Sequence, residues 1–167
     1  MKRMILVVFA LAAVLVPAAL AATPAQGPTV FCKANPSLIG TSTYKNMGDC
    51  VAKQAALAKA NRVNAAKACT AEKANANFAT DHLGKTFDQF YASSDAKGKG
   101  NGNGNAYGNC VSQKASGKTA EQQNTLVKAA KKCKAAPLKD QIGASPKTYR
   151  NFGACVAAQV KLSKAAA

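Results

Sequence analysis

The sequence predicts an all-α protein: a small disulfide-stapled helical repeat protein with two long helices, a shorter C-terminal helix and irregular loops. The first observation behind this prediction is a segment ending in Gly-x-Cys-Val, which occurs at residues 44–51, 105–111 and 149–156. Each copy opens a stretch of helix-forming residues. The second observation is that six cysteines accompany the three copies, two to each. The chain therefore consists of cysteine-framed repeats.

The repeats form a single predicted helical domain over residues 32–167. Its three units are 32–68, 69–132 and 133–167, and each has one cysteine at its start and one in its Gly-x-Cys-Val segment. The first and third units also share the opening Cys-Lys-Ala-x-Pro and a later Ile-Gly step. This frame predicts one disulfide per unit. The predicted pairs are Cys32 with Cys50, Cys69 with Cys110, and Cys133 with Cys155.

The first long helix supports this pairing. From Asp49 to Leu83 the chain has no Gly or Pro, so Cys50 and Cys69 are expected on one helix. A helix rises 1.5 Å per residue, which separates them by about 28 Å. A disulfide requires Cα atoms within roughly 4.4 to 6.8 Å, so these two cannot pair. One alternative stays open, because a helix break at Ser116-Gly117 would let Cys110 reach the next cysteine.

The disulfides matter because the predicted core is small. Beyond residue 21, Leu, Ile, Val and Phe number 20 in 146 residues. That share lies below the roughly 20% at which a highly charged chain tends toward disorder. Alanine takes the place of larger side chains and buries little area at about 25 cal/mol per Å². Cross-links are therefore expected to stabilise the fold.

The elements follow from local signals. Residues 22–31, rich in Pro and Gly, are expected to form a flexible N-terminus. The first long helix is expected from a cap at Asn46 to about residue 76, and the second over about 107–136. A shorter third helix follows a cap at Asn151. These caps satisfy free amides at each helix start.

One face of the first long helix is predicted to form core and the opposite face to be solvated. The lysines Lys53, Lys59 and Lys67 lie on the solvated face. The core face comprises Met47, Cys50, Val51, Leu57, Ala58, Ala65 and Cys69.

Residues 1–21 are predicted to be a signal peptide that is removed on export. A basic head precedes an apolar run over 5–20, and Ala19-Leu20-Ala21 matches the small-x-small pattern of a cleavage site. The alternative is an uncleaved membrane anchor, because the run falls only slightly short of the roughly 20 residues that span a bilayer. Export predicts a secreted or cell-envelope protein in which disulfides persist.

The charge of the exported chain is strongly positive. Without Lys2 and Arg3, the 23 basic residues become 21 against 7 acidic ones, a net charge of +14. Such a field favours anionic partners: cell-wall polymer, anionic lipid or extracellular nucleic acid. The alternative is that the lysines only keep an alanine-rich protein in solution. The candidate anion-contacting residues are Lys97, Lys99, Lys128, Lys131, Lys132 and Lys134.

No cofactor, metal site or catalytic centre is predicted. The cysteines are spaced by 18 residues or more, no CxxC occurs, and His82 is the only histidine. Asp81, His82 and Asp88 lie near one another without a nucleophile in a recognisable frame, which favours ordinary surface over acid-base work. The Gly-rich segment 97–105 is read as a flexible linker, with phosphate binding as the alternative.

The large apolar residues of unit two are predicted to fill the space that alanine leaves in the core, with a ligand groove as the alternative. They are Phe78, Leu83, Phe87, Phe90 and Tyr91.

Two short motifs carry a resemblance. Residues 107–112, Tyr-Gly-Asn-Cys-Val-Ser, and the Ala-Ala-Lys-x-Cys segments at 65–69 and 129–133 resemble small exported Ala/Lys-rich proteins of actinobacterial type with repeated aromatic-Gly-x-Cys-Val segments. The resemblance implies export and a repeated cysteine frame, and it implies no activity.

Three functional classes remain at this level. The leading expectation is a non-enzymatic exported cationic binding or structural protein of the cell envelope or extracellular space, which contacts anionic polymers. A membrane-active or antimicrobial secreted factor is the second, although the helices lack a large apolar face. An enzyme or inhibitor with an unrecognised site is the third.

Overall fold

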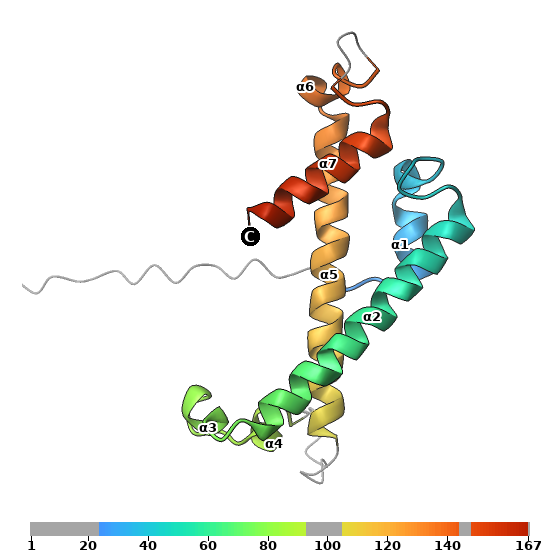
Figure 1. The fold of residues 1–167 in the computed structure, drawn as a ribbon. Helices are drawn as coiled ribbons and strands as arrows, with labels where there is room; N and C mark the ends of the chain where they lie inside the picture. The colour runs from blue at the N-terminus through green and yellow to red at the C-terminus, as the bar shows by residue number, and fades with distance from the viewer. Residues whose placement is uncertain (1–23, 93–104, 144–147, 167) are drawn as a thin grey trace, which may run out of the picture.

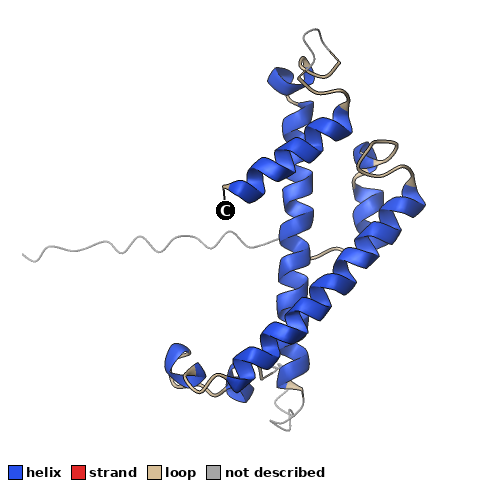
Figure 2. Ribbon diagram, in the orientation of Figure 1, coloured by secondary structure: helices blue, strands red, loops and turns tan. Residues whose placement is uncertain are grey.

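A computed structural model describes residues 24–92, 105–143 and 148–166. Over these residues the fold is helical, with loops between the helices and no strand (Figure 2). The elements are α1 (Pro28–Ala34), a short 3-10 helix η1 (Pro36–Leu38), α2 (Met47–Ala74), α3 (Phe78–Asp81), α4 (Phe87–Phe90), α5 (Ala106–Lys134), α6 (Ala136–Lys139) and α7 (Phe152–Ala165). The all-α prediction is confirmed.

Helix α5 is the central helix of the fold and contacts α2, α4, α6 and α7. In Figure 1, α7 crosses its upper part and α2 crosses its lower part, while α3 and α4 lie beyond the far end of α2. The two crossing helices pack against α5, so each contributes one face to a shared interior. The repeats therefore meet through the central helix of the second unit.

An asparagine side chain caps the helix at each of the three Gly-x-Cys-Val segments, although the backbone is extended at Asn46 and Asn151 and left-handed at Asn105, with φ of 76°. The side-chain oxygens of Asn46, Asn105 and Asn151 each accept a hydrogen bond from the backbone N–H three residues on, at 2.8, 3.0 and 2.8 Å. An asparagine at this position satisfies an amide that has no partner inside the helix. The caps predicted at Asn46 and Asn151 are confirmed.

The loops before these helices also repeat. Gly40 and Gly143 both have φ of 73°, and each lies inside a loop closed by a single backbone bridge from the preceding Ile to the following Tyr. This left-handed conformation favours glycine because it has no Cβ. In unit two the corresponding turn uses Leu83 and Gly84, with φ of 56° and 79°.

The predicted disulfides are confirmed. All three have a Cα to Cα distance of 6.0 Å. They join Cys32 with Cys50, Cys69 with Cys110, and Cys133 with Cys155. The possible break at Gly117 does not occur, because α5 runs unbroken from Ala106 to Lys134 and keeps Cys110 and Cys133 far apart.

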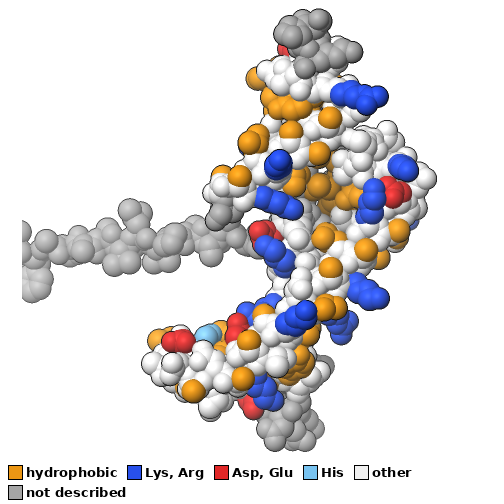
Figure 3. Space-filling model, in the orientation of Figure 1, with side chains coloured by type: hydrophobic (Ala, Val, Ile, Leu, Met, Phe, Trp, Pro, Cys, Tyr) orange, Lys and Arg blue, Asp and Glu red, His pale blue; other side chains and the backbone are white. Residues whose placement is uncertain are grey.

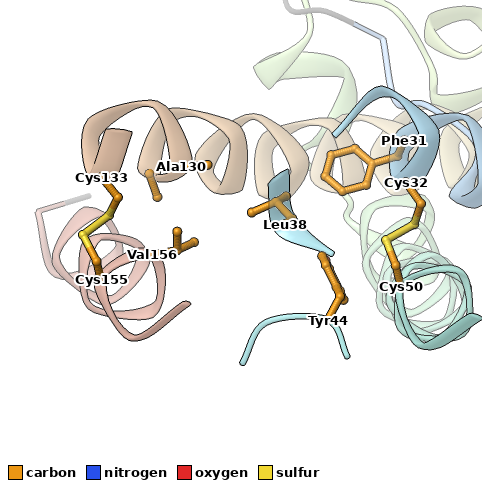
Figure 4. Close-up of a cluster of buried hydrophobic side chains, with 10 residues drawn as sticks. Phe31, Cys32, Leu38, Tyr44, Cys50, Ala130, Cys133, Cys155 and Val156 are labelled. Carbon is orange, nitrogen blue, oxygen red and sulfur yellow. A yellow bond between two sulfur atoms is a disulfide. The ribbon is translucent and has the colours of Figure 1, made fainter. Parts of the chain in front are cut away.

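Two separate cores lie toward the two ends of α5. The first gathers units one and three, and Figure 4 shows Leu38 between two disulfides with α5 running along the cluster. Its buried residues include Phe31, Leu38, Tyr44, Ala129, Ala130 and Val156, with Cys32, Cys50, Cys133 and Cys155. The second surrounds the remaining disulfide and contains Ala65, Cys69, Phe78, Phe87, Tyr91, Cys110 and Val111.

The core prediction for unit two is partly right. Phe78, Phe87 and Tyr91 are buried, with ring centroids of 4.9 to 6.3 Å between them. Leu83 is instead 96% exposed and Phe90 is 43% exposed. The turn that contains Leu83 directs its side chain into solvent, so this residue contributes nothing to the core.

The expectation of a flexible segment over 22–31 is wrong from Pro28 onward. Pro28 begins α1, where a proline is accommodated because its missing N–H would have no helical partner. Phe31 is 1% exposed and packs into the first core. The aromatic side chain therefore anchors this part of the chain in the first core, where α1 packs against α2. The predicted signal peptide, 1–21, lies outside the described residues.

Candidate functional site

A buried polar layer joins α2 to α5 between the two cores. Gln54 and Asn61 of α2 are 4% and 6% exposed, and Thr119 and Gln123 of α5 are 6% and 5% exposed. Gln123 Nε2 donates to Gln54 Oε1 at 3.1 Å, and Asn61 Nδ2 donates to Thr119 Oγ1 at 3.0 Å. Buried amides are tolerated when they are paired in this way. The predicted apolar face of α2 is therefore interrupted, and Met47 from it is 40% exposed.

Gln123 also holds the chain that leads into α1. Its Oε1 accepts from the backbone N–H of Gln26 at 2.9 Å, and its Nε2 donates to the backbone carbonyl of Gln26 at 2.9 Å. One side chain thus makes a two-bond contact like that between paired strands. The backbone at Gln26 is therefore held in place by a side chain that lies 97 positions later in the sequence.

Tyr44 ends the polar layer at the first core. Its side chain is 4% exposed, and its hydroxyl oxygen accepts from Gln54 Nε2 at 2.7 Å. Burial raises the pKa of the Tyr44 hydroxyl, and the bond from Gln54 opposes that rise only in part. Among the described hydrogen bonds, this hydroxyl group takes part only as an acceptor. The neutral phenol can therefore also act as a donor.

A cleft of about 520 Å³ opens between α2, α5 and α7, beside Tyr44 and Gln54. The apolar part of its lining consists of Leu57, Leu126 and Val160, one from each helix. Figure 3 shows this hollow between α7 and α2, with hydrophobic atoms inside it and lysine side chains at its edges. The size is that of an ordinary small-ligand pocket.

Lysines from three helices border the cleft, and two of them have acidic partners. Lys53 Nζ lies 2.9 Å from Asp49 Oδ2, and Lys118 Nζ lies 2.8 Å from Glu121 Oε2. The third is Lys164 of α7, which takes part in none of the described ion pairs. One positive charge at the edge of the cleft is thus left without a partner in the described structure.

The four predicted anion-contacting lysines of α5 do not form one compact patch. Lys128, Lys131, Lys132 and Lys134 are all exposed. At about 100° per residue they spread over roughly 160° of the helix circumference. Lys131 borders a groove beside Phe31, and Lys134 borders a different groove. The other two predicted lysines, Lys97 and Lys99, lie outside the described residues.

The cleft residues were missed at the sequence level, although a signal for two of them is present. The spacing from Tyr44 to Gln54 recurs from Tyr149 to Gln159, where Gln159 Nε2 lies 3.4 Å from the Tyr149 hydroxyl. A tyrosine and a glutamine ten residues apart in two repeats indicates a side-chain pair. Nothing local indicates Lys164, whose place depends on how α7 crosses α5.

His82 of unit two packs against the neighbouring aromatic side chains. The His82 ring stacks on Phe78 with centroids 3.9 Å apart, and its Nδ1 lies 3.0 Å from the Phe78 carbonyl oxygen. Among the described ion pairs none includes His82, Asp81 or Asp88. The histidine therefore belongs to the aromatic cluster of unit two.

Within the described ranges, no three His, Cys, Asp or Glu side chains gather where they could hold a metal ion. In the same ranges none of the helices is long and apolar enough to cross a membrane. Comparisons with protein-family models, curated proteins and solved structures give no match to this chain.

Proposed function

We propose that the protein is an exported, non-enzymatic cationic binding protein that contacts anionic polymer in the cell envelope or extracellular space. The observation that carries the proposal is a large charge excess with little internal pairing. Of the 21 basic residues beyond residue 21, the described part holds 18, against six acidic residues. Only three ion pairs form among them. Most of the lysines are available to an external anion.

The electrostatics favour an extended polyanion. Each lysine that neutralises a phosphate or carboxylate of a polymer releases a condensed counterion, so many weak contacts add up. Lysines spread around a helix suit a partner that lies across the surface better than one compact ligand. The proposal also includes export, which the pairing of all six cysteines favours.

The salt dependence of binding tests this function. Binding of random-sequence duplex DNA and of polyglutamate is measured by fluorescence anisotropy at several NaCl concentrations between roughly 50 and 200 mM. We expect the logarithm of the affinity to fall linearly with the logarithm of the salt concentration for both polymers. Affinity that does not change with salt, or no binding to either polymer at low salt, would contradict the proposal.

Matched variants locate the binding surface. Changing Lys128, Lys131 and Lys132 to Gln removes three charges from α5, and the control changes Lys59, Lys67 and Lys73 to Gln on α2. Both variants have the same net charge. We expect the α5 variant to reduce the salt slope by about 0.9 for each DNA phosphate that is no longer neutralised, and the α2 variant to reduce it less. Equal reductions would show that charge alone, and not the α5 lysines, sets the affinity.

Export has its own test. Sequencing the N-terminus of the protein from culture supernatant and from the envelope fraction is expected to give a chain that begins at Ala22. A chain that begins at Met1 in the membrane fraction would support the uncleaved anchor.

A further inference from the structure

We propose that the cleft between α2, α5 and α7 is a binding site for a small amphiphilic carboxylate, a molecule with one anionic head on a compact apolar body. The proposal does not rest on polymer binding, because it uses different residues and a different kind of ligand. Three features of the cleft support it: its apolar lining, its single uncompensated lysine, and the hydroxyl of Tyr44, which among the described hydrogen bonds acts only as an acceptor.

The apolar lining of the cleft indicates that the main part of the ligand is apolar. Leu57, Leu126 and Val160 converge from three helices on a cleft of about 520 Å³. Apolar side chains that line a concave site favour an apolar ligand because covering them removes surface from water. A hydrated polymer of acidic sugars or phosphates exposes less hydrocarbon to such a lining than an alkyl chain does. The cleft therefore fits a small molecule with a hydrocarbon portion.

The charge at the edge of the cleft determines which head group the ligand carries. Three lysines border the cleft, and the carboxylates of Asp49 and Glu121 pair with two of them. Lys164 remains, so the edge of the cleft carries about one positive charge in excess. A monoanion complements this arrangement, whereas a neutral amphiphile leaves the charge without a partner.

Tyr44 supplies a neutral donor beside these charges. It lines the cleft, is 4% exposed, and receives a hydrogen bond from Gln54, which also lines the cleft. Among the hydrogen bonds of the described residues, the Tyr44 hydroxyl takes part only as the acceptor from Gln54. A phenol hydroxyl that Gln54 holds in place at the cleft can donate its proton to a ligand there, and a carboxylate oxygen is a suitable partner.

The first measurement compares octanoate with octanol, which share an apolar chain and differ in charge. Each is titrated into the mature protein with its disulfides intact, and amide shifts are followed by NMR. We expect octanoate to shift amides of α2, α5 and α7 that face the cleft, and to bind at least about threefold more tightly than octanol, as an exposed ion pair allows. Equal binding of both ligands, or shifts away from the cleft, would overturn the proposal.

Variants at exposed positions separate the cleft from general charge. Lys164→Gln removes the uncompensated cation, and Lys161→Gln is the matched control on the same helix outside the cleft lining. Ser163→Trp places a large side chain in the cleft from an exposed position. We expect Lys164→Gln to lower octanoate affinity about threefold, Lys161→Gln to leave it unchanged, and Ser163→Trp to abolish it.

Circular dichroism before and after heating confirms that each variant folds. Equal effects of Lys161→Gln and Lys164→Gln, or octanoate binding by a folded Ser163→Trp protein, would overturn the proposal. Duplex DNA binding is measured on the same variants. Loss of octanoate binding with unchanged DNA binding in Ser163→Trp is expected, so failure of one proposal is distinguishable from failure of the other.

Discussion

Units one and three approach each other closely at Gly153. A Cβ on Gly153 would collide with the Ser42 side chain and would lie 2.7 Å from the Ser42 backbone nitrogen. Gly48 has the same place in unit one, where the nearest such atom is Asn46 Oδ1 at 3.4 Å. The two glycines therefore have the same place in the motif, but only at Gly153 does a neighbouring backbone leave no room for a Cβ. Among the motif glycines Gly48, Gly108 and Gly153 of the described residues, only Gly153 lies against another repeat.

This difference predicts unequal effects for the same substitution. Gly153→Ala is expected to lower the free energy of unfolding by roughly 1 to 3 kcal/mol, because the backbone of Ser42 must move. Gly48→Ala is expected to change it by less than about 0.5 kcal/mol. Urea unfolding followed by circular dichroism measures both. Equal effects at the two sites would contradict the close approach seen here.

A carboxylate network stabilises the second core at neutral pH. Partial burial acts to raise the pKa of Glu72, but hydrogen bonds from Lys114 and Tyr91 outweigh it and hold the pKa below its ordinary value of 4.5. Lys114 Nζ lies 2.7 Å from Glu72 Oε1, and the Tyr91 hydroxyl donates to Glu72 Oε2 at 2.8 Å. The charged form of Glu72 is therefore favoured in the folded protein.

The sign of the pH effect follows from the lowered pKa. The stabilisation is present above the unfolded pKa of Glu72 and is lost as the pH falls through the folded value, so stability declines on acidification below about pH 4.5. Glu72→Gln is expected to show a smaller decline of the urea midpoint between neutral pH and about pH 3. A wild-type decline that Glu72→Gln reproduces in full would exclude this network as a source.

At the scale of elements, α5 connects two cores through a polar middle. Gly117 lies in that middle, within an unbroken helix, and a Cβ there would meet no atom within 4 Å. Glycine inside a helix costs conformational entropy without contributing contacts. The helix is continuous at this residue because its packing against α2 outweighs the low helix propensity of glycine.

Gly117→Ala is therefore expected to stabilise the protein by roughly 0.5 to 1 kcal/mol. The gain comes from restricting the unfolded chain and from better helix propensity, with no new clash. Thermal unfolding at neutral pH measures it as a higher Tm. A lower Tm would indicate that the glycine is needed for a conformation that the unbroken helix does not show.

For the whole molecule, the disulfides are distributed unevenly between the cores. Two of them belong to the first core and one, from Cys69 to Cys110, to the second. That single link closes a span of 41 residues, the longest of the three. A cross-link restricts the unfolded chain more when its loop is longer. The second core therefore depends most on one bond.

Replacing Cys69 and Cys110 together by Ala is expected to cost roughly 2 to 4 kcal/mol and to act locally. Hydrogen exchange should accelerate in α3, α4 and the first turns of α5, because these elements surround the missing link. The end of α5 near Cys133 should keep its protection. Uniform acceleration along α5 would show that the two cores unfold as one unit.

The sequence by itself determined the two long helices and the C-terminal helix, and it indicated the charge available to partners. It also predicted the disulfide pairing, with the alternative at Gly117 left open until the structure showed α5 unbroken. These features depend on local or periodic signals: the Asn caps, helix-forming composition, and cysteine spacing along a rigid helix. Export and polymer contact stay predictions. The prediction of a flexible start to the chain failed at Pro28, because a long-range contact of Phe31 outweighed local Pro and Gly composition.

The tertiary structure alone decided the polar layer and the cleft. Gln54 and Asn61 lie on the predicted core face of α2, but as polar residues they gave no sign that they would pair with α5. They are buried because α2 and α5 cross where each supplies the other's hydrogen-bond partners. Lys164 borders the cleft only because α7 crosses α5 at the angle that its disulfide and Gly153 permit. Side chains brought together by crossing helices leave no periodic trace in sequence, since their spacing is set by packing in space.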